Sequence, residues 1–192
     1  MGKIYCLIGK SASGKDTVYR RITELRPDLG SYVMYTTRQM RDGEIQGKNY
    51  FFVNEDRLKH FEEEGKLIES RTYSTVYGPW TYATVDDGQI DLGKRDYIMT
   101  GTLQSFEALK SFYGSENVVP VYIELDDGVR LQRALNREMS GEHPKYKELC
   151  RRFIADCDDF SDDKIKAAGI VKRFYNDDLN KCVDEIIKTF GL

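Results

Sequence analysis

The sequence predicts an α/β fold in which a parallel sheet is flanked by helices. Short apolar runs have the length and composition of strands that are buried on both faces, and they lie at residues 4–8, 97–99, 118–125 and 171–175. Apolar residues recur with helical spacing in the segments between and after these runs, at residues 16–25, 103–112, 129–139 and 179–190. This alternation is typical of right-handed crossovers between neighbouring parallel strands.

Two regions interrupt the alternation. Residues 32–92 are richer in Tyr, Thr and Arg, and they predict a small antiparallel insertion with strands near 50–53, 67–77 and 81–85 and a helix near 56–64. Residues 138–150 are polar and charged, which predicts an exposed mobile loop and not a core element. We therefore expect a single domain with a core of residues 1–31, 93–137 and 151–192, an insertion at 32–92 and a lid at 138–150.

Composition excludes several classes of protein. A chain of 192 residues that is 40% hydrophobic and 32% charged can bury a core and is neither disordered nor a membrane protein. A net charge of −3 gives no general attraction to nucleic acid or to anionic membranes. No apolar stretch approaches the ~18 residues that span a bilayer, and no signal peptide is visible. We expect a soluble cytoplasmic protein, monomeric or homodimeric, without nucleic-acid or membrane partners.

The cysteines and histidines carry no metal or disulfide pattern. Cys6, Cys150, Cys157 and Cys182 are scattered without a C-x-x-C pair, and the two histidines lie far apart. We therefore expect free thiols in a reducing compartment, with Cys6 packed as a small buried hydrophobe.

A glycine-rich loop follows the first predicted strand and precedes the first predicted helix. Residues 9–15 fit G-x-x-x-x-G-K, whose backbone N–H groups form an anion-binding nest at a helix N-terminus. Lys15 can reach the β- and γ-phosphates, and it argues against an ordinary glycine turn. The loop indicates a P-loop NTPase-type sheet that binds ATP and Mg²⁺. We expect these residues to hold the nucleotide: Gly9, Ser11, Ser13, Gly14, Lys15, Asp16 and Thr17.

The position after Lys15 departs from the usual motif. Asp16 stands where Ser or Thr normally ligates Mg²⁺, and Thr17 follows one residue later. Asp16 either holds the ion through water or faces solvent, and Thr17 is better placed for the α-phosphate. No side chain is assigned as a direct metal ligand, with Asp16 and Thr17 as the candidates.

Two arginines in the insertion have the spacing of a phosphate clamp. Arg38 and Arg41 are three residues apart and could converge on one dianionic phosphate, with the Tyr50 hydroxyl as a further donor. For the arginine pair alone, a solvated turn would be the simpler interpretation.

The surrounding residues resemble the guanylate kinase family. Residues 36–44 fit its T-T-R-x-x-R-x-G-E motif and residues 47–53 fit G-x-x-Y-x-F-V, and the resemblance extends over nearly the whole chain in family order. It implies that Arg38, Arg41 and Tyr50 hold the phosphate of GMP. It also implies that Glu69 in Leu67-Ile68-Glu69 accepts from N1 and N2 of guanine.

Two later segments depart from the family pattern. Tyr82-Ala83-Thr84 resembles a Y-G-T/S segment that contacts base and phosphate, although it comes about four residues later than usual. The family's D-x-D pair after the next strand is replaced by Thr100-Gly101-Thr102. The loss of both carboxylates leaves strict GMP selectivity open. Thr102 could still accept a hydrogen bond from an amino group of the base.

Arginines near the predicted lid complete the resemblance. Arg130, Arg133 and Arg137 share one helical face, and residues 133–137 resemble the family's R-L-x-x-R. Arg152 resembles a later family arginine. The resemblance implies that Arg133 binds ATP and that Arg137 and Arg152 act with Lys15 on the transferring phosphoryl group. For Arg130 we keep the simpler interpretation of a solvated position on a basic face.

One segment near the end resembles the family's turn over adenine. Residues 175–179 resemble N-D-D/G-L, which implies that Asn176 packs on the base of ATP. A helix N-cap would also explain Asn and Asp at this place, and both interpretations can hold together.

The expected reaction is therefore Mg²⁺-dependent transfer from ATP to GMP, giving ADP and GDP. Two alternatives stay open. A related P-loop kinase could use another small phosphorylated acceptor, as the missing aspartates would allow. A non-catalytic guanylate-kinase-like module could bind phosphorylated peptides, although the Gly14-Lys15 loop and the lid arginines argue against it.

Overall fold

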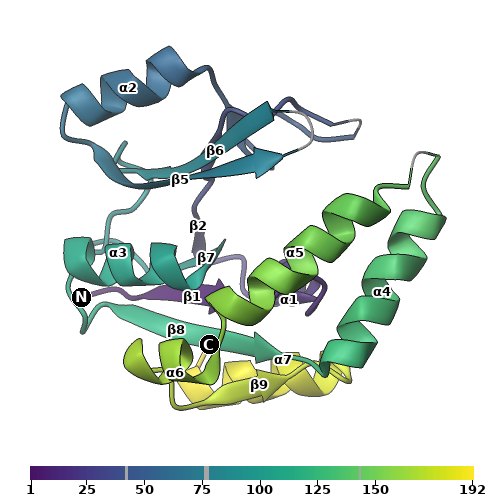
Figure 1. Ribbon diagram of the computed structural model, residues 1–192. Helices are drawn as coiled ribbons and strands as arrows, with labels where there is room; N and C mark the ends of the chain where they lie inside the picture. The colour runs from purple at the N-terminus through teal and green to yellow at the C-terminus, as the bar shows by residue number, and fades with distance from the viewer. Residues whose placement is uncertain (42, 76–77, 143) are drawn as a thin grey trace.

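The computed structural model describes residues 1–192 apart from 42, 76–77 and 143, and these residues form a mixed α/β structure with two sheets (Figure 1). The first of these two sheets is parallel in all its pairings, with the strand order β2-β7-β1-β8-β9. Its strands are β1 (Ile4–Ile8), β2 (Gly30–Ser31), β7 (Tyr97–Gly101), β8 (Val118–Glu124) and β9 (Arg173–Tyr175). The α/β class and the parallel sheet expected from the sequence are confirmed.

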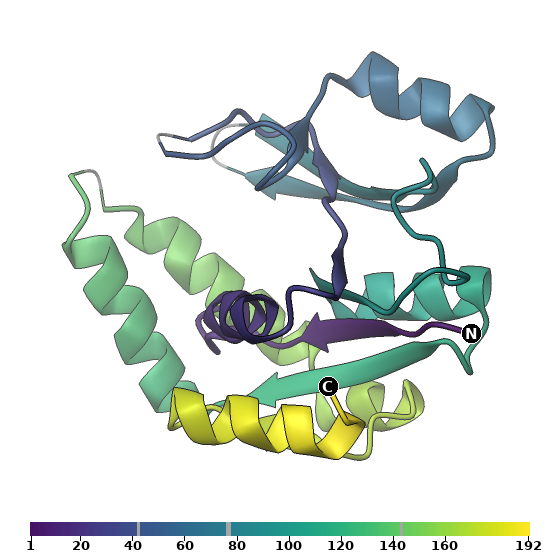
Figure 2. The same cartoon turned by 180° about the vertical axis from the view of Figure 1, so that it is seen from behind.

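Helices cover both faces of this sheet. On one face lie α1 (Lys15–Leu25) and α7 (Leu179–Phe190), seen in front in Figure 2. On the other face lie α3 (Leu103–Tyr113) and α6 (Asp162–Ala167). Successive residues of β1 therefore enter different hydrophobic clusters, and the whole strand is buried.

The second sheet is built from the residues between β2 and β7. Its order is β4-β3-β6-β5, and the strands are β3 (Tyr35–Thr36), β4 (Phe51–Phe52), β5 (Leu67–Thr75) and β6 (Gly78–Val85). β5 and β6 form an antiparallel hairpin, whereas β3 and β4 pair in parallel. The sheet is therefore mixed, although the sequence predicted an antiparallel one. Helix α2 (Glu55–Glu63) packs Leu58 and Phe61 against it.

A helical hairpin projects from the first sheet toward the second (Figures 1 and 2). It consists of α4 (Asp127–Met139) and α5 (Tyr146–Asp159), which pack together. The expectation of a mobile loop over residues 138–150 is wrong for 138–139, which end α4, and for 146–150, which open α5 and bury Leu149, while residue 143 lies outside the described residues. The charges of this segment are paired along the helix, with Glu148 bonded to Arg151, so high polarity here does not mean a loop.

Several element boundaries differ from the sequence expectation for simple reasons. β9 begins at Arg173 and not at residue 171, because Val171 is 94% exposed and joins no strand. β2, β3 and α6 were not predicted, since elements of two to six residues carry no readable period. No helix in the described part of the chain is both long and apolar enough to cross a membrane.

Candidate active site

The loop of residues 9–14 joins β1 to α1 at the carboxyl edge of the first sheet. Gly14 has φ 86°, and a Cβ added there would lie 2.2 Å from Asn176 Nδ2. That Nδ2 donates to the Ser13 carbonyl over 2.8 Å, so Asn176 holds the loop in shape. At Gly9 an added Cβ would lie 2.6 Å from the Ile123 carbonyl of β8. Glycine is therefore required at position 9 by the nearby β8 backbone, and at position 14 by the positive φ and the nearby Asn176 side chain.

A cavity of about 230 Å³ opens over this loop. It is lined by Lys10, Ala12, Ser13, Gly14, Lys15, Asp16, Thr17, Arg133 and Arg137. Cations outnumber the single carboxylate in this lining, and the N-terminus of α1 adds its partial positive charge. The cavity is therefore suited to a polyanion such as a polyphosphate.

Some predicted nucleotide ligands lie elsewhere or have other partners. The Ser11 backbone N–H donates to Asp156 Oδ2 over 2.7 Å, and Ser11 is outside the lining of this cavity. Asn176 is buried and is bonded to the loop, while the N-cap of α7 is Asp178, which accepts from the Lys181 N–H. The N-cap interpretation thus holds for this segment at Asp178.

The residues present offer few ligands to a metal ion. The Asp16 side chain is 83% exposed and lies 3.4 Å from Lys15 Nζ. No group of three or more His, Cys, Asp or Glu residues in the described part of the chain could hold a metal ion. Asp16 and Thr17 line the loop cavity, and Mg²⁺ commonly takes one or two protein ligands and fills its shell with phosphate oxygens and water, so these two oxygen-bearing side chains are compatible with the ion.

The lid arginines fall into two groups. Arg133 and Arg137 line the loop cavity, and Arg133 also donates to the Asn176 carbonyl over 3.4 Å. Arg152, on α5, is outside that lining and lies between Glu138 at 3.8 Å and Glu148 at 3.7 Å. The structure brings Arg133 and Arg137 to the loop but leaves Arg152 with acidic neighbours.

Arg130 is not solvated, and the expectation for it is wrong. Its side chain is 1% exposed and donates to Asp127 Oδ1 from two nitrogens, over 2.9 and 2.7 Å. Its Nη1 donates to the Ser11 carbonyl over 2.8 Å and lies 3.6 Å from Asp156 Oδ2. The guanidinium also lies over the Phe153 ring. Sequence reasoning missed this site because its partners come from three separate segments.

The predicted phosphate clamp is closed on a carboxylate. Arg38 is 3% exposed and donates to both oxygens of Glu44 over 2.8 Å. These hydrogen bonds hold the pKa of the Glu44 carboxyl below its usual value. Glu44 also accepts from the Arg41 backbone N–H over 2.7 Å, which places Arg41 on the same turn with its side chain exposed.

Aromatic rings surround this clamp. The Arg38 guanidinium lies 5.3 Å from the ring centre of Tyr50 and also 5.3 Å from that of Phe52. Burial raises the pKa of the Tyr50 phenol to about 12, so it stays a hydrogen-bond donor at neutral pH. The rings of Tyr50 and Tyr82 are 5.7 Å apart. The predicted residues Arg38, Tyr50 and Tyr82 are thus brought together.

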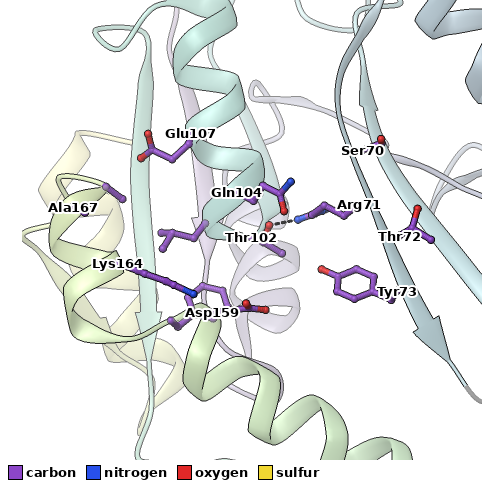
Figure 3. Close-up of a pocket in the computed structure, with 13 residues that line it drawn as sticks. Ser70, Arg71, Thr72, Tyr73, Thr102, Gln104, Glu107, Asp159, Lys164 and Ala167 are labelled. Carbon is purple, nitrogen blue, oxygen red and sulfur yellow. Dashed lines mark hydrogen bonds between the residues drawn. The ribbon is translucent and has the colours of Figure 1, made fainter.

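A buried polar cluster joins the other predicted acceptor residues. Thr84 Oγ1 donates to Glu69 Oε1 over 2.8 Å, and Arg71 Nε lies 3.4 Å from Glu69 Oε2. Arg71 Nη1 donates to Thr102 Oγ1, the N-cap of α3 (Figure 3). Arg71 was not predicted, although strand periodicity would have placed it on the same face as Glu69.

A second cavity, of about 770 Å³, lies beside this cluster between the second sheet, α3 and the segment around α6 (Figure 3). Its lining is Ser70, Arg71, Thr72, Tyr73, Thr102, Leu103, Gln104, Glu107, Asp159, Phe160, Lys164, Ala167 and Ala168. The smaller cavity is a cationic site over the glycine-rich loop, and the larger one is a cavity with a mixed polar and apolar lining beside the second sheet. This fold and this pair of sites define a kinase of the small-molecule phosphotransferase class.

Comparison with known proteins narrows the class. The family model "Guanylate kinase" matches residues 1–162. A guanylate kinase of Geobacter metallireducens is 29% identical over 197 residues, covering 96% of this chain and 86% of the relative. One of Caldanaerobacter subterraneus subsp. tengcongensis is 38% identical over 78 residues, 40% of this chain and 38% of the relative.

A solved structure agrees in fold. The crystal structure of guanylate kinase from Anaplasma phagocytophilum has a TM-score of 0.67 and 19% identity, and covers 99% of this chain and 85% of that chain. At this identity the likeness concerns the fold. The family match over most of the sequence decides the identity: the chain belongs to the guanylate kinase family.

Proposed function

We propose that this protein is an ATP-dependent guanylate kinase that converts GMP and ATP into GDP and ADP. The proposal rests on the observation that one chain carries two sites, the cavity over the loop and a polar site on the second sheet. A cationic phosphate-loop cavity contains Lys15, and an acceptor site on the second sheet combines the Arg38 clamp with the buried carboxylate of Glu69. The named activity of the relatives is consistent with this pairing.

The proposed chemistry is an in-line phosphoryl transfer. A phosphate oxygen of GMP forms a bond to the γ-phosphorus of ATP, while the bond from that phosphorus to the β–γ bridging oxygen breaks and ADP leaves. Lys15 and the loop N–H groups hold the donor phosphates, and Arg133 and Arg137 neutralise their charge from α4. Mg²⁺, held by Asp16 or Thr17, would supply further charge neutralisation when bound.

The acceptor phosphate replaces a carboxylate in this scheme. Arg38 is already closed bidentately on Glu44, so the phosphate of GMP would take the place of that carboxylate, with Arg41 and Tyr50 as further donors. Glu69, with Thr84 fixing one of its oxygens, would accept the N1 and N2 hydrogens of guanine. Adenine has no such pair of donors on this edge.

We propose that the lid is the segment of the α4–α5 hairpin where α4 ends and α5 begins. We place the core at residues 1–31, 93–137 and 151–192, the acceptor insertion at 32–92 and the lid at 138–150. Arg152 would leave Glu138 and Glu148 to reach the transferring phosphoryl group, and closure would exclude water that could hydrolyse ATP. Free cysteines fit a reducing cytoplasm.

The test is a coupled ADP-release assay with ATP, Mg²⁺ and GMP. Wild type should turn over, Lys15→Met should lose at least about 100-fold in kcat, and Glu69→Ala should impair GMP-dependent turnover. Glu62→Gln, an exposed change on α2, is the matched control. Turnover of AMP, UMP, CMP or sugar phosphates in place of GMP would favour another acceptor. ATP binding without turnover of any acceptor would favour a binding module.

A further inference from the structure

Strand β5 presents a row of polar side chains to the amino end of α3. Glu69 and Arg71 are buried while Ser70 and Thr72 are exposed, which is the alternation expected of a strand with one covered face. Figure 3 shows the Arg71 side chain directed at Thr102, with Ser70 directed away from it. The carboxylate of Glu69 and the guanidinium of Arg71 therefore lie side by side on the covered face of β5, next to the cavity of about 770 Å³.

Arg71 is buried, and it makes fewer hydrogen bonds to the described residues than its guanidinium has N–H groups. Its side chain is 7% exposed, and that of Glu69 is 5% exposed. Arg71 Nη1 donates to Thr102, and Arg71 Nε makes no hydrogen bond within the described part of the chain but lies 3.4 Å from Glu69 Oε2 as an ion pair. A guanidinium carries five N–H groups, and leaving donors unsatisfied in a buried site is costly. Beyond these two contacts the guanidinium has further N–H groups, and because Arg71 lines the cavity, a ligand bound there can supply an acceptor for them.

The guanidinium is the charged group of this pair that faces the cavity. Arg71 and Thr102 belong to the lining of the 770 Å³ cavity, whereas Glu69 does not. Residues 100 and 102, where the related motif has aspartates, are both threonine. The acceptor site thus pairs one buried carboxylate with one buried cation. Such a site can bind a hydrogen-bond acceptor of a ligand through the arginine and a hydrogen-bond donor of the same ligand through the carboxylate.

We propose that Arg71 is a specificity-determining residue for the acceptor base, donating to the carbonyl oxygen at C6 of a 6-oxopurine nucleoside monophosphate while Glu69 accepts the neighbouring N1–H. The inference rests on the proposed function and deepens it. A 6-oxopurine shows an acceptor at C6 and a donor at N1, which complements an arginine beside a carboxylate. Adenine shows a donor at C6 and an acceptor at N1, so both contacts would be repelled.

The first experiment varies the acceptor and leaves the protein unchanged. kcat/KM is measured for wild type with GMP, IMP, AMP and the 5′-monophosphate of 2-aminopurine riboside, which keeps the 2-amino group but lacks both the C6 carbonyl and the N1–H. IMP, which keeps the carbonyl, should be used at least about tenfold better than the 2-aminopurine nucleotide. Use of the 2-aminopurine nucleotide as well as or better than IMP would overturn the role of Arg71.

The second experiment changes the residue. Arg71→Met should lower kcat/KM for GMP and IMP by a similar factor, about 10- to 100-fold, and leave the 2-aminopurine nucleotide and the KM for ATP unchanged. Arg71→Lys, which keeps the charge but not the planar fork, should lose less. Arg95→Met, at an exposed position away from both cavities, is the matched control.

The possible failures are distinguishable. An equal loss with every acceptor, or a changed KM for ATP, would mean that Arg71 is structural and would overturn the inference. If Arg71→Met melts below the assay temperature, Arg71→Lys and Arg71→Gln take its place in the same acceptor series. GMP turnover without discrimination at C6 would refute only the role of Arg71, whereas no turnover of any acceptor by wild type would refute the proposed function and this inference with it.

Discussion

Arg130 brings a full positive charge into the interior between the phosphate loop and the lid helices. Its neighbours are the Ser11 carbonyl in the loop, Asp127 on α4, and Asp156 and Phe153 on α5. Asp156 also accepts from the Ser11 N–H, so one carboxylate serves the loop and the arginine together. This cluster ties the base of the α4–α5 hairpin to the loop.

Removing the shared carboxylate should destabilise the protein. Asp156→Ala would leave the Ser11 N–H and one side of Arg130 without an acceptor, and we expect a loss of about 1–3 kcal/mol in the free energy of unfolding. Urea denaturation followed by circular dichroism measures it. Asp158→Ala, exposed on the same helix, is the control. Equal stability of the two variants would show that Arg130 finds other partners.

The four cysteines should differ sharply in reactivity. Burial raises the pKa of the Cys6 thiol to about 12 and that of Cys182 to about 12, whereas Cys150 is exposed. At pH 8 a disulfide reagent should therefore modify Cys150 in the folded protein and reach Cys6 and Cys182 only in denaturant. Mass spectrometry of the labelled peptides assigns each thiol. Rapid native labelling of Cys6 would contradict its burial in the first sheet.

At the scale of elements, the acceptor turn depends on one ion pair. The folded-state pKa of Glu44 is lowered by its hydrogen bonds from Arg38, so the pair adds stability above the ordinary value of 4.5, and that stability is lost as pH falls through the folded-state pKa. Glu44→Gln should thus be less stable than wild type at pH 7, and the gap should narrow as pH falls below 4.5 and through the folded-state pKa. Thermal melts across this range measure it, and a gap independent of pH would contradict the assignment.

Elements with their own hydrophobic pattern could be predicted from the sequence. β1 is a run of five apolar residues and α7 carries a one-sided apolar stripe, so both were predicted with the bounds that the structure shows. α5 was missed because its stability comes partly from polar contacts outside itself, such as Asp156 with the phosphate loop. Local periodicity does not report such contacts.

The residues of the candidate site also divide into those that the sequence predicted and those that it did not. Lys15, Arg38 and Glu69 were predicted because motifs of adjacent residues mark them. Arg71 and Arg130 were not, because their roles depend on partners 31 and 119 residues away in the chain, at Thr102 and Ser11. Folding creates those neighbours, and a short motif holds no information on them.

For the whole molecule, the separation of the proposed donor and acceptor sites predicts closure. The phosphate loop belongs to the first sheet and the Arg38 clamp to the second, with the α4–α5 hairpin projecting toward that second sheet (Figure 2). Transfer requires the two phosphates to meet, so the sheets and the hairpin should approach one another when both substrates bind.

Small-angle scattering can measure this approach. We expect the radius of gyration to fall when GMP and a non-hydrolysable ATP analogue are present together, and to change less with either alone. Lys15→Met, which weakens the donor site, should reduce the response at the same concentrations. An unchanged radius in the ternary complex would mean that the sites are already in transfer geometry.

The place of β1 in the first sheet also governs how the chain can fold. β1 lies at the centre and pairs with β7 and β8, so its partners come only at residues 97–101 and 118–124. The β5–β6 hairpin, in contrast, closes over neighbouring residues. On a ribosome the hairpin can form early, whereas the apolar β1 cannot complete its pairing until residues 97–124 have emerged, so this strand stays available to chaperones during much of synthesis.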